Sequence, residues 1–354
     1  MTEPDHPARA AAAARALQRW YSRRTGEWRT AGWWNAANAL TAVAGYTRHT
    51  GDNSHARVLE TTFRHAGRRH PGFVNMFFDD NGWWGLAWVA AYDLTGDDRY
   101  LAAARAIFAH NLGGWDGVCG GGLWWNTKRT YKNAITNELF VTLAAQLHQR
   151  TPDDREYLSW ALRAWEWLSA RALIGPGGLV NDGLGADCAN NGGTAWTYNQ
   201  GVILGGLAAL HDITGDGTYL SRGEFIADAA LGGLTSAHGI LTEPCEPAAN
   251  PAGAGCNGDQ TQFKGIFARY LHEFYLRSGK PAYREFLLAN AGSVWDNGRN
   301  CDDQFGLSWG GPFDRADASR QSSALEVLTP PRPSPRARPR PAPGHKTGAS
   351  LVVG

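Results

Sequence analysis

Apolar stretches with helical spacing alternate along the chain with short polar turns. The turns contain Thr-Gly-Asp at residues 50–52, 95–97 and 214–216, with related triplets at residues 151–153 and 278–280. A glycine in the left-handed conformation ends a helix, and an aspartate after it accepts hydrogen bonds from the first free N–H groups of the next helix. The pattern therefore predicts the corners of antiparallel helix pairs.

Successive corners lie 45 to 64 residues apart, which is enough for two helices and their loops. Residues 1–328 hold about six units of about 55 residues each, and alternating strand patterns are nearly absent. Twelve helices in six hairpins predict an all-α fold, an (α/α)6 barrel whose inner helices surround a central cleft. An open solenoid of helix pairs is the alternative. We favour the closed ring because the loops between hairpins are rich in Gly, Trp, Asn and Asp, which one rim would gather into a single site.

The composition changes abruptly after Leu328. Residues 329–354 contain seven of the 17 prolines and five Lys or Arg residues without any acid. Such a segment buries too little apolar surface to offset the cost of ordering it. We therefore expect one domain, residues 1–328, followed by a disordered extension, residues 329–354.

Charge and cysteine content exclude several classes of protein. The chain has 34 Lys and Arg against 33 Asp and Glu, unlike a strongly basic nucleic-acid binder, and no stretch reaches the roughly 20 apolar residues of a membrane span. The five cysteines include no C-x-x-C, so no metal site is expected. Cys245 and Cys256 could be joined, but the odd number of cysteines and the lack of a secretory leader favour free thiols and, by default, the cytoplasm.

Two adjacent acids, Asp79 and Asp80, precede a long apolar helix and are flanked by Phe77, Phe78, Trp83 and Trp84. A lone Asp there would be read as a helix cap, but only one of two can cap, and the aromatic rings would desolvate the other. Neighbouring carboxylates in such surroundings tend to differ in protonation. Glycoside hydrolysis needs such a pair, one acid and one base or nucleophile. Because adjacent Cα atoms are about 3.8 Å apart, the spacing leans towards the shorter separation of retaining enzymes.

Further polar and aromatic residues are candidates for contacts with a hydroxyl-rich ligand. Tryptophan rings offer stacking faces, and two asparagines four residues apart share a helix face. The alternatives are core packing for the rings, buried and satisfied amides for the asparagines, an Asx turn for the aspartate, and a surface position for the lysine. The candidates are Trp83, Trp125, Asn133, Asn137, Asp182, Tyr198, Asn199, Gln200 and Lys264. The glycines of residues 113–122 would let backbone approach a ligand closely.

Other motifs fail in their context. The G-x-G-x-x-G at residues 253–258 follows a Pro-rich loop instead of a strand, so it does not predict dinucleotide binding. Adjacent aspartates could hold Mg²⁺ for a diphosphate, but such a site needs basic residues for the phosphates, and the surroundings here are tryptophan and glycine. We therefore expect no cofactor and no metal.

Six segments, taken together, resemble glycoside hydrolase family 76, the α-1,6-mannanases. They are FFDDNGWWGLAWVAAYDLTGD, GWDGVCGGGLWW, YKNAITNELF, TYNQG, FKGIFARYL and GPFDRADASRQSSALEVL, in order from about residue 28 to 328. The resemblance implies an (α/α)6 barrel and a retaining mechanism without a metal. It also implies that Asp79 is the nucleophile and Asp80 the general acid/base. Bacterial members are usually exported, and the missing leader is a departure from that pattern.

The leading hypothesis is an endo-acting α-1,6-mannosidase that binds α-mannan or manno-oligosaccharides as a monomer. A transglycosylase that uses the same two aspartates is one alternative. A non-catalytic glycan-binding protein is another, although binding alone does not require two adjacent acids.

Overall fold

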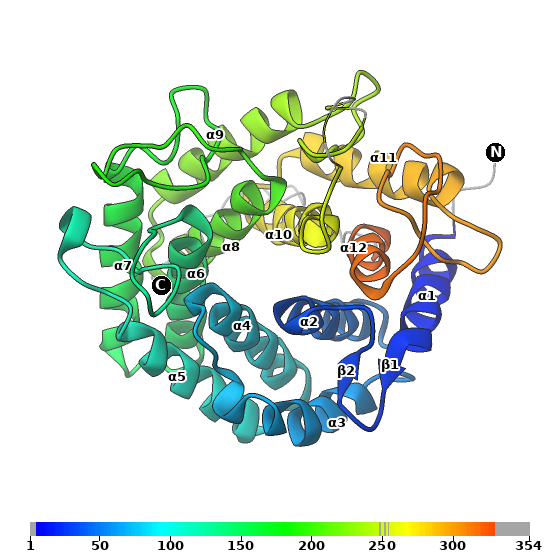
Figure 1. Ribbon diagram of the computed structural model, residues 1–354, viewed down its shortest axis with the longest axis horizontal. Coiled ribbons are helices and arrows are strands. Elements are labelled where there is room, and N and C mark those ends of the chain that lie inside the picture. The colour runs from blue at the N-terminus through cyan, green and yellow to red at the C-terminus, as the bar shows by residue number, and fades with distance from the viewer. Residues whose placement is uncertain (1–4, 248, 251–252, 254, 330–354) are drawn as a thin grey trace, which may run out of the picture.

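The computed structural model describes residues 5–247, 249–250, 253 and 255–329 (Figure 1). Within these residues the chain forms twelve α-helices and one short hairpin of two strands, β1 and β2, which pair Tyr21 with Trp28 and Ser22 with Glu27. The elements are α1 (His6–Leu17), β1 (Tyr21–Ser22), β2 (Glu27–Trp28), α2 (Trp33–Thr50), α3 (Arg57–His65), α4 (Phe78–Thr95), α5 (Asp98–Leu112), α6 (Ala134–Arg150), α7 (Arg155–Ala170), α8 (Thr197–Thr214), α9 (Thr218–Gly233), α10 (Phe263–Ser278), α11 (Pro281–Asn297) and α12 (Ala318–Leu328).

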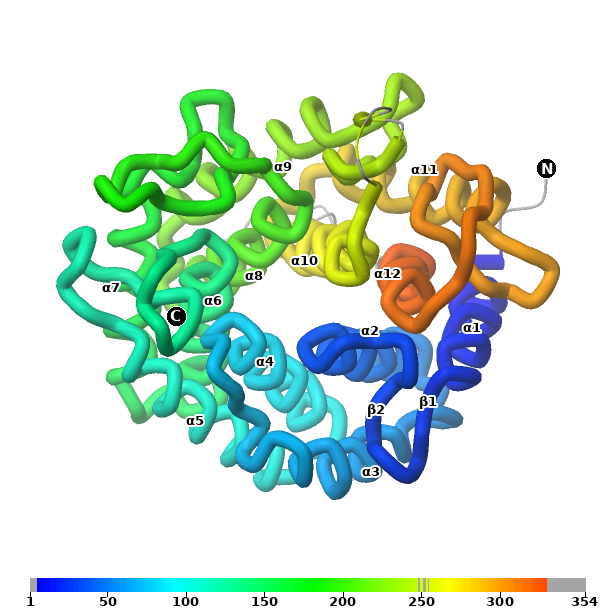
Figure 2. The backbone as a smooth tube through the Cα atoms, viewed as in Figure 1, coloured from blue at the N-terminus to red at the C-terminus, as the bar shows by residue number. Residues whose placement is uncertain are grey.

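The even-numbered helices form a closed inner ring, which confirms the predicted (α/α)6 barrel. Each packs against the next, from α2 through α4, α6, α8 and α10 to α12, and α12 packs against α2. The odd-numbered helices lie outside this ring, and Figure 2 shows the last helix returning beside the first two. A solenoid would leave α2 and α12 apart, so the contact between them excludes that alternative.

The predicted corners are where the inner helices end. Gly51, Gly96, Gly215 and Gly279 have φ between 69° and 76° and cap α2, α4, α8 and α10. Thr151 ends α6 without a glycine, at φ −142°. All five corners join an inner helix to the next outer helix, so they lie at one end of the barrel, and the longer loops between hairpins lie at the other.

Two glycines allow the inner helices to approach closely. A Cβ on Gly201 of α8 would lie 2.6 Å from the Cα of Phe267 in α10, and a Cβ on Gly265 of α10 would lie 2.4 Å from the Cα of Ser323 in α12. Larger side chains would force these helices apart. The apolar core lies between the two rings, as in the stacking of Trp88 of α4 on Tyr100 of α5.

The expectation of free thiols was wrong. Cys119 is joined to Cys188 and Cys245 to Cys256, while Cys301 is free and exposed. The first pair is separated by 69 residues and joins the loop between α5 and α6 to the loop between α7 and α8, which belong to neighbouring hairpins. The division into residues 1–328 and 329–354 stays a prediction, because all of the extension except Thr329 lies outside the described residues.

Candidate active site

A cleft of about 470 Å³ opens where the inner helices begin. Its walls come from the loops between hairpins and from the first turns of α2, α4, α8 and α10, with Asn133 contributed by the residue that precedes α6. The lining residues are Gly32, Trp33, Trp34, Asn35, Phe77, Asp79, Asp80, Trp83, Trp125, Tyr131, Asn133, Asp182, Trp196, Tyr198, Asn257, Asp259, Gln260 and Phe263.

Asp79 and Asp80, the aspartate pair, occupy the first turn of α4 and both line the cleft. Neither caps the helix, because the cap position is held by Phe77 without a side-chain hydrogen bond. The indole Nε1 of Trp125 donates to Asp79 Oδ2 at 3.0 Å, and Nδ2 of Asn75 donates to Asp80 Oδ2 at 2.7 Å. The first turn of a helix also favours negative charge through the helix dipole. Each carboxyl group is thus held in place by a different neighbour.

Burial raises the pKa values of both acids. The pKa of Asp79 lies well above its ordinary value, because of burial first and the charge of Asp80 second, while the Trp125 hydrogen bond lowers it. The pKa of Asp80 is raised to about 6, chiefly by burial and also by Asp259, against the hydrogen bond from Asn75. At least one proton therefore stays on the aspartate pair up to about pH 6, as the sequence led us to expect of two acids among aromatic rings.

Aromatic rings form one continuous wall of the cleft. Tyr198 stacks on Phe263 with ring centroids 3.7 Å apart, and Trp83 lies between Tyr198 at 6.4 Å and Trp34 at 5.6 Å. These rings come from four inner helices. Flat apolar faces beside hydrogen-bonding groups suit a ligand that has both C–H faces and hydroxyl groups, as sugars do.

Two more aspartates join the aspartate pair in the cleft. Asp182 accepts a hydrogen bond from the hydroxyl group of Tyr131 at 2.5 Å, and burial raises its pKa while this hydrogen bond lowers it. Asp259 accepts a hydrogen bond from Nε1 of Trp34 at 2.9 Å. The cleft therefore has four carboxyl groups, contributed by three separate parts of the chain.

Five of the nine predicted ligand-contacting residues line the cleft: Trp83, Trp125, Asn133, Asp182 and Tyr198. Asn133 also caps α6, since its side chain accepts a hydrogen bond from the Thr136 N–H. These five stay candidates for contacts with substrate.

Asn137 and Gln200 do not reach the cleft, which corrects their assignment. Asn137 is fully buried and exchanges two hydrogen bonds with the backbone of Leu123. Gln200, also fully buried, does the same with the backbone of Val180. Both side chains hold rim loops against the helices, because a buried amide can satisfy a backbone N–H and a C=O together.

Asn199 and Lys264 are likewise absent from the lining of the cleft. Asn199 is fully buried, and its amide has no hydrogen-bond partner among the described residues. Lys264 is 1% exposed and forms an ion pair with Glu246 at 2.5 Å, with its Nζ also donating to the Leu307 carbonyl at 2.8 Å. A buried ammonium group needs such partners, so the structure gives Lys264 a supporting role.

The glycine-rich loop also serves the fold more than a ligand. The carbonyl groups of Val118, Gly121 and Gly122 accept hydrogen bonds from Nζ of Lys132, which is also paired with Asp116 at 2.8 Å. The loop wraps around an ammonium group, and none of its residues lines the cleft.

Several cleft residues escaped the sequence analysis, including Trp33, Trp34, Trp196 and Asp259. The predicted ring of helices could have identified these residues. Every inner helix of a barrel starts at the same rim, so residues just before or within each first turn are candidates whatever their local motif.

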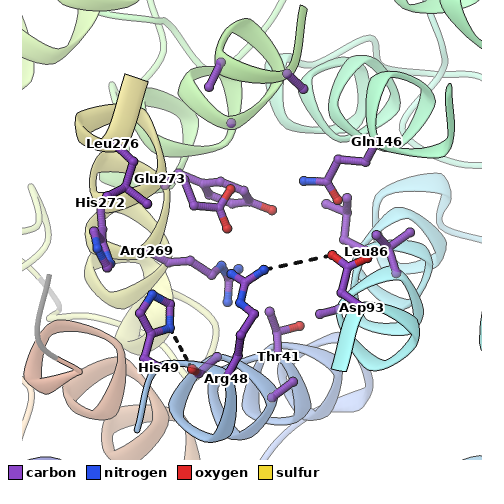
Figure 3. A pocket seen from close by; sticks show the side chains of 18 of the residues that line it. Thr41, Arg48, His49, Leu86, Asp93, Gln146, Arg269, His272, Glu273 and Leu276 are labelled. Carbon is purple, nitrogen blue, oxygen red and sulfur yellow. Dashed lines mark hydrogen bonds and ion pairs between the residues drawn. The ribbon is translucent and has the colours of Figure 1, made fainter. Parts of the chain in front are cut away.

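A second cavity, of about 310 Å³, lies where the inner helices end (Figure 3). Several of its charged residues are paired with one another. Asp93 of α4 forms an ion pair with Arg150 and lies 3.9 Å from Arg48, while Arg269 pairs with Glu326 at 2.6 Å. We call this the far cavity.

Among the described residues, no group of three or more His, Cys, Asp or Glu side chains is placed to hold a metal ion. No helix in the described part of the chain is long and apolar enough to cross a membrane.

Known proteins with related sequences point to one family. The model of glycosyl hydrolase family 76 matches residues 7–339. A mannan endo-1,6-alpha-mannosidase of Candida albicans is 30% identical over 329 residues, which cover 84% of this chain and 71% of that protein. A putative mannan endo-1,6-alpha-mannosidase of Schizosaccharomyces pombe is 31% identical over 264 residues, and the match spans 58% of its length.

Solved structures agree. An α-1,6-mannanase of Salegentibacter sp., an inactive variant with two adjacent aspartates replaced by asparagine, was solved with α-1,6-mannotriose. It superimposes with a TM-score of 0.82 at 28% identity, over 92% of this chain and 98% of that one. An α-mannanase of Bacteroides thetaiotaomicron, at 18% identity and a TM-score of 0.74, shares the fold. Since the family model covers nearly the whole chain, this protein belongs to glycosyl hydrolase family 76.

Proposed function

We propose that this protein is a retaining endo-acting hydrolase of α-1,6-mannosidic bonds in mannan. The observation that carries the proposal is the aspartate pair, held at the floor of an aromatic cleft in a family 76 chain. The inactive Salegentibacter variant, which binds α-1,6-mannotriose, supports it because two adjacent aspartates are replaced there. The names of the fungal relatives support the same linkage.

The proposed reaction has two steps. Asp79 attacks the anomeric carbon while Asp80 gives its proton to the glycosidic oxygen, so the bond to the leaving chain breaks and a mannosyl ester forms on Asp79. Asp80, now ionised, takes a proton from water, and the water oxygen displaces Asp79 from the sugar. The product keeps the configuration of the substrate, and both acids return to their starting states.

This division of roles requires the shared proton to lie on Asp80 when the sugar binds. Burial favours the neutral form of both acids, and more strongly that of Asp79. The Trp125 N–H stabilises the ionised form of Asp79, since a donor to a carboxylate favours its charge. Nδ2 of Asn75 does the same for Asp80, so the nucleophile role of Asp79 follows from the resemblance to family 76, and a pKa of about 6 suits Asp80 as the acid/base.

The test is hydrolysis of α-1,6-mannotetraose followed by chromatography and by NMR of the first product. We expect shorter manno-oligosaccharides whose new reducing end is the α-anomer. The β-anomer as first product would exclude retention, and no release of products would exclude the proposed function. Products longer than the substrate would indicate transfer to a second sugar instead of water.

The two disulfide bonds are relevant to the compartment in which the protein acts. Disulfides form and persist in oxidising compartments and are rare in the cytosol. They support an oxidising site of action in place of the cytoplasm expected from the sequence.

A further inference from the structure

The cleft has acidic groups without basic ones. Its described lining residues include four aspartates and no lysine, arginine or histidine. The far cavity, in contrast, is lined by four arginines, which are Arg48, Arg150, Arg269 and Arg277. The chain has 34 Lys and Arg in total, so their absence from the cleft is a local arrangement.

Two lysines near the rim, Lys132 and Lys264, are buried against partners of their own. Lys132 is enclosed by Asp116 and loop carbonyl groups, and Lys264 is paired with Glu246. Both are at most 2% exposed, so neither can turn towards a bound ligand without giving up these partners. The partial positive charge at the N-terminus of α4 is offset by the two acids in its own first turn.

Asp259 is held firmly at the exposed edge of the cleft. Its side chain accepts the hydrogen bond from Trp34, and its N–H donates to Asn257 Oδ1 at 2.9 Å. Cys256, joined to Cys245, directly precedes this turn. A fixed carboxylate acts on a ligand more effectively than a mobile surface charge, because it does not move away as the ligand approaches.

Asp182 adds acidity from another side. It belongs to the loop between α7 and α8, whereas Asp259 precedes α10 and the aspartate pair begins α4. Tyr131 holds its carboxyl group through a hydrogen bond of 2.5 Å. A ligand in the cleft is therefore surrounded by carboxyl groups from three directions.

We propose that the cleft selects uncharged or cationic glycans and rejects glycans that carry phosphate or carboxylate groups, with Asp259 and Asp182 as the residues that set this selection. The inference deepens the proposed function and rests on it, since it names the charge class of the substrate. Like charges brought together in a site without a counter-ion oppose binding. The opposition extends about 10 Å at 0.1 M salt and about 30 Å at 0.01 M.

The experiment compares three forms of α-1,6-mannotetraose that differ only at the reducing end. One is the neutral alditol, one the aldonic acid and one the 1-amino derivative. At an ionic strength of about 10 mM we expect kcat/KM for the acid to be at least about tenfold below that for the alditol. The amine should react at least as well as the alditol. At about 0.5 M salt the difference between acid and alditol should shrink to less than about threefold.

Asp259→Asn keeps an acceptor for Trp34 and removes one charge. It should raise the ratio of kcat/KM for the acid to that for the alditol at least about threefold at low salt. Asp153→Asn, at an exposed position between α6 and α7 at the opposite end of the barrel, is the matched control and should leave the ratio unchanged.

Tryptophan fluorescence, with five tryptophans in the cleft, measures binding independently of turnover. Equal affinity for acid and alditol, or equal loss with acid and amine, would overturn the proposed selection while leaving the hydrolase intact. Failure to cleave the alditol, with discrimination by charge still seen in binding, would overturn the proposed function and not the selection.

Discussion

The two ends of the barrel are built from the same six helices but differ in whether their acidic side chains have basic partners. In the cleft, four carboxyl groups lie together with hydrogen-bond donors such as Trp34, Trp125 and Tyr131 but without a basic partner among the described lining residues. In the far cavity, Asp93 pairs with Arg150 and lies beside Arg48 (Figure 3), and Glu326 pairs with Arg269. In the cleft, burial raises the pKa values of Asp79 and Asp80 with no basic side chain to oppose it. Burial raises the pKa of Glu326 too, but there the charge and hydrogen bond of Arg269 oppose the effect.

Helix α4 shows the contrast within one element. It carries the aspartate pair in its first turn and Asp93 in its last. Unpaired charge at a cleft reduces stability but supplies a proton donor near neutral pH, whereas the ion pairs at the other end join neighbouring helices. The difference indicates that the reaction takes place at one end of the barrel, while the ion pairs at the other end hold the helices together. Substitutions at the two ends should therefore have different effects.

The largest effect expected is on activity. Asp79→Asn removes the proposed nucleophile and Asp80→Asn the proposed acid/base, so each should lower kcat on α-1,6-mannan by about 10²-fold to 10⁴-fold or more. Asp93→Asn, on the same helix, should change kcat less than about threefold, since it lies at the opposite end. Azide or a substrate with a good leaving group should restore part of the activity of Asp80→Asn, whereas the overall reaction of Asp79→Asn with an ordinary polymer should not be rescued. Comparable activity in all three variants would show that the two ends of the barrel do not differ in their contribution to catalysis.

The dependence of kcat/KM on pH should reflect an acid in the cleft and not Asp93 at the other end of the barrel. Because the proposed reaction needs a proton on Asp80, whose pKa is about 6, kcat/KM should fall about tenfold per pH unit above that value. The profile of Asp93→Asn should have the same limb. Rates measured from pH 4 to pH 9 check this, and a rate that stays level up to pH 8 would argue against Asp80 as the acid.

Stability should change in opposite directions at the two ends. The folded pKa of Asp80, about 6, lies above the value of 3.8 for an ordinary Asp. The stability linked to its proton is thus complete below about pH 4 and is lost as the pH rises through about 6, by about 3 kcal/mol. Asp80→Asn should therefore be more stable than the parent protein at pH 8 and similar at pH 4. Urea unfolding at both values measures this difference.

Asp93→Asn should have the opposite effect. It removes the ion pair with Arg150, whose side chain is 17% exposed, and the weaker contact with Arg48. We expect a loss of about 1 to 2 kcal/mol in the free energy of unfolding at pH 7, between the values for exposed and buried pairs. A variant as stable as the parent would mean that the far cavity does not tie the helices together.

The smallest expected effect is that of Asp259, at the rim of the cleft, on the pKa of Asp80. Asp259 contributes to the raised pKa of Asp80, so Asp259→Asn should move the basic limb of the pH profile to lower pH by less than about one unit, since salt screens an exposed charge. Asp153→Asn should leave the limb in place. A shift to higher pH would contradict the arrangement of acids described for the cleft.

The sequence predicted what depends on local patterns. The glycine corners at Gly51, Gly96, Gly215 and Gly279 predicted the helix pairs and the ring, and the adjacent aspartates predicted the floor of the cleft. What failed depends on distant contacts. Trp34 donates a hydrogen bond to Asp259, which lies 225 residues later in the chain, and no local sequence pattern predicts such a contact.

Burial at the rim was equally hidden. Lys264 follows a polar stretch at the start of a helix, where an exposed position is expected, yet Glu246 and the Leu307 carbonyl enclose it. Asn137 and Gln200 are polar residues at helix starts, like Asn133 and Tyr198, and only the packing of the loops decides which of them face the cleft.

In the proposed mechanism Asp79 becomes covalently bonded to the sugar while Asp80 transfers the proton. The direct measurement is mass spectrometry of peptides after the Asp80→Asn variant reacts with an α-mannosyl fluoride, whose leaving group needs no acid. We expect one added mannosyl group on the peptide, bonded to Asp79. A label on any other residue, or complete turnover that passes through no labelled protein and gives the inverted anomer, would contradict it.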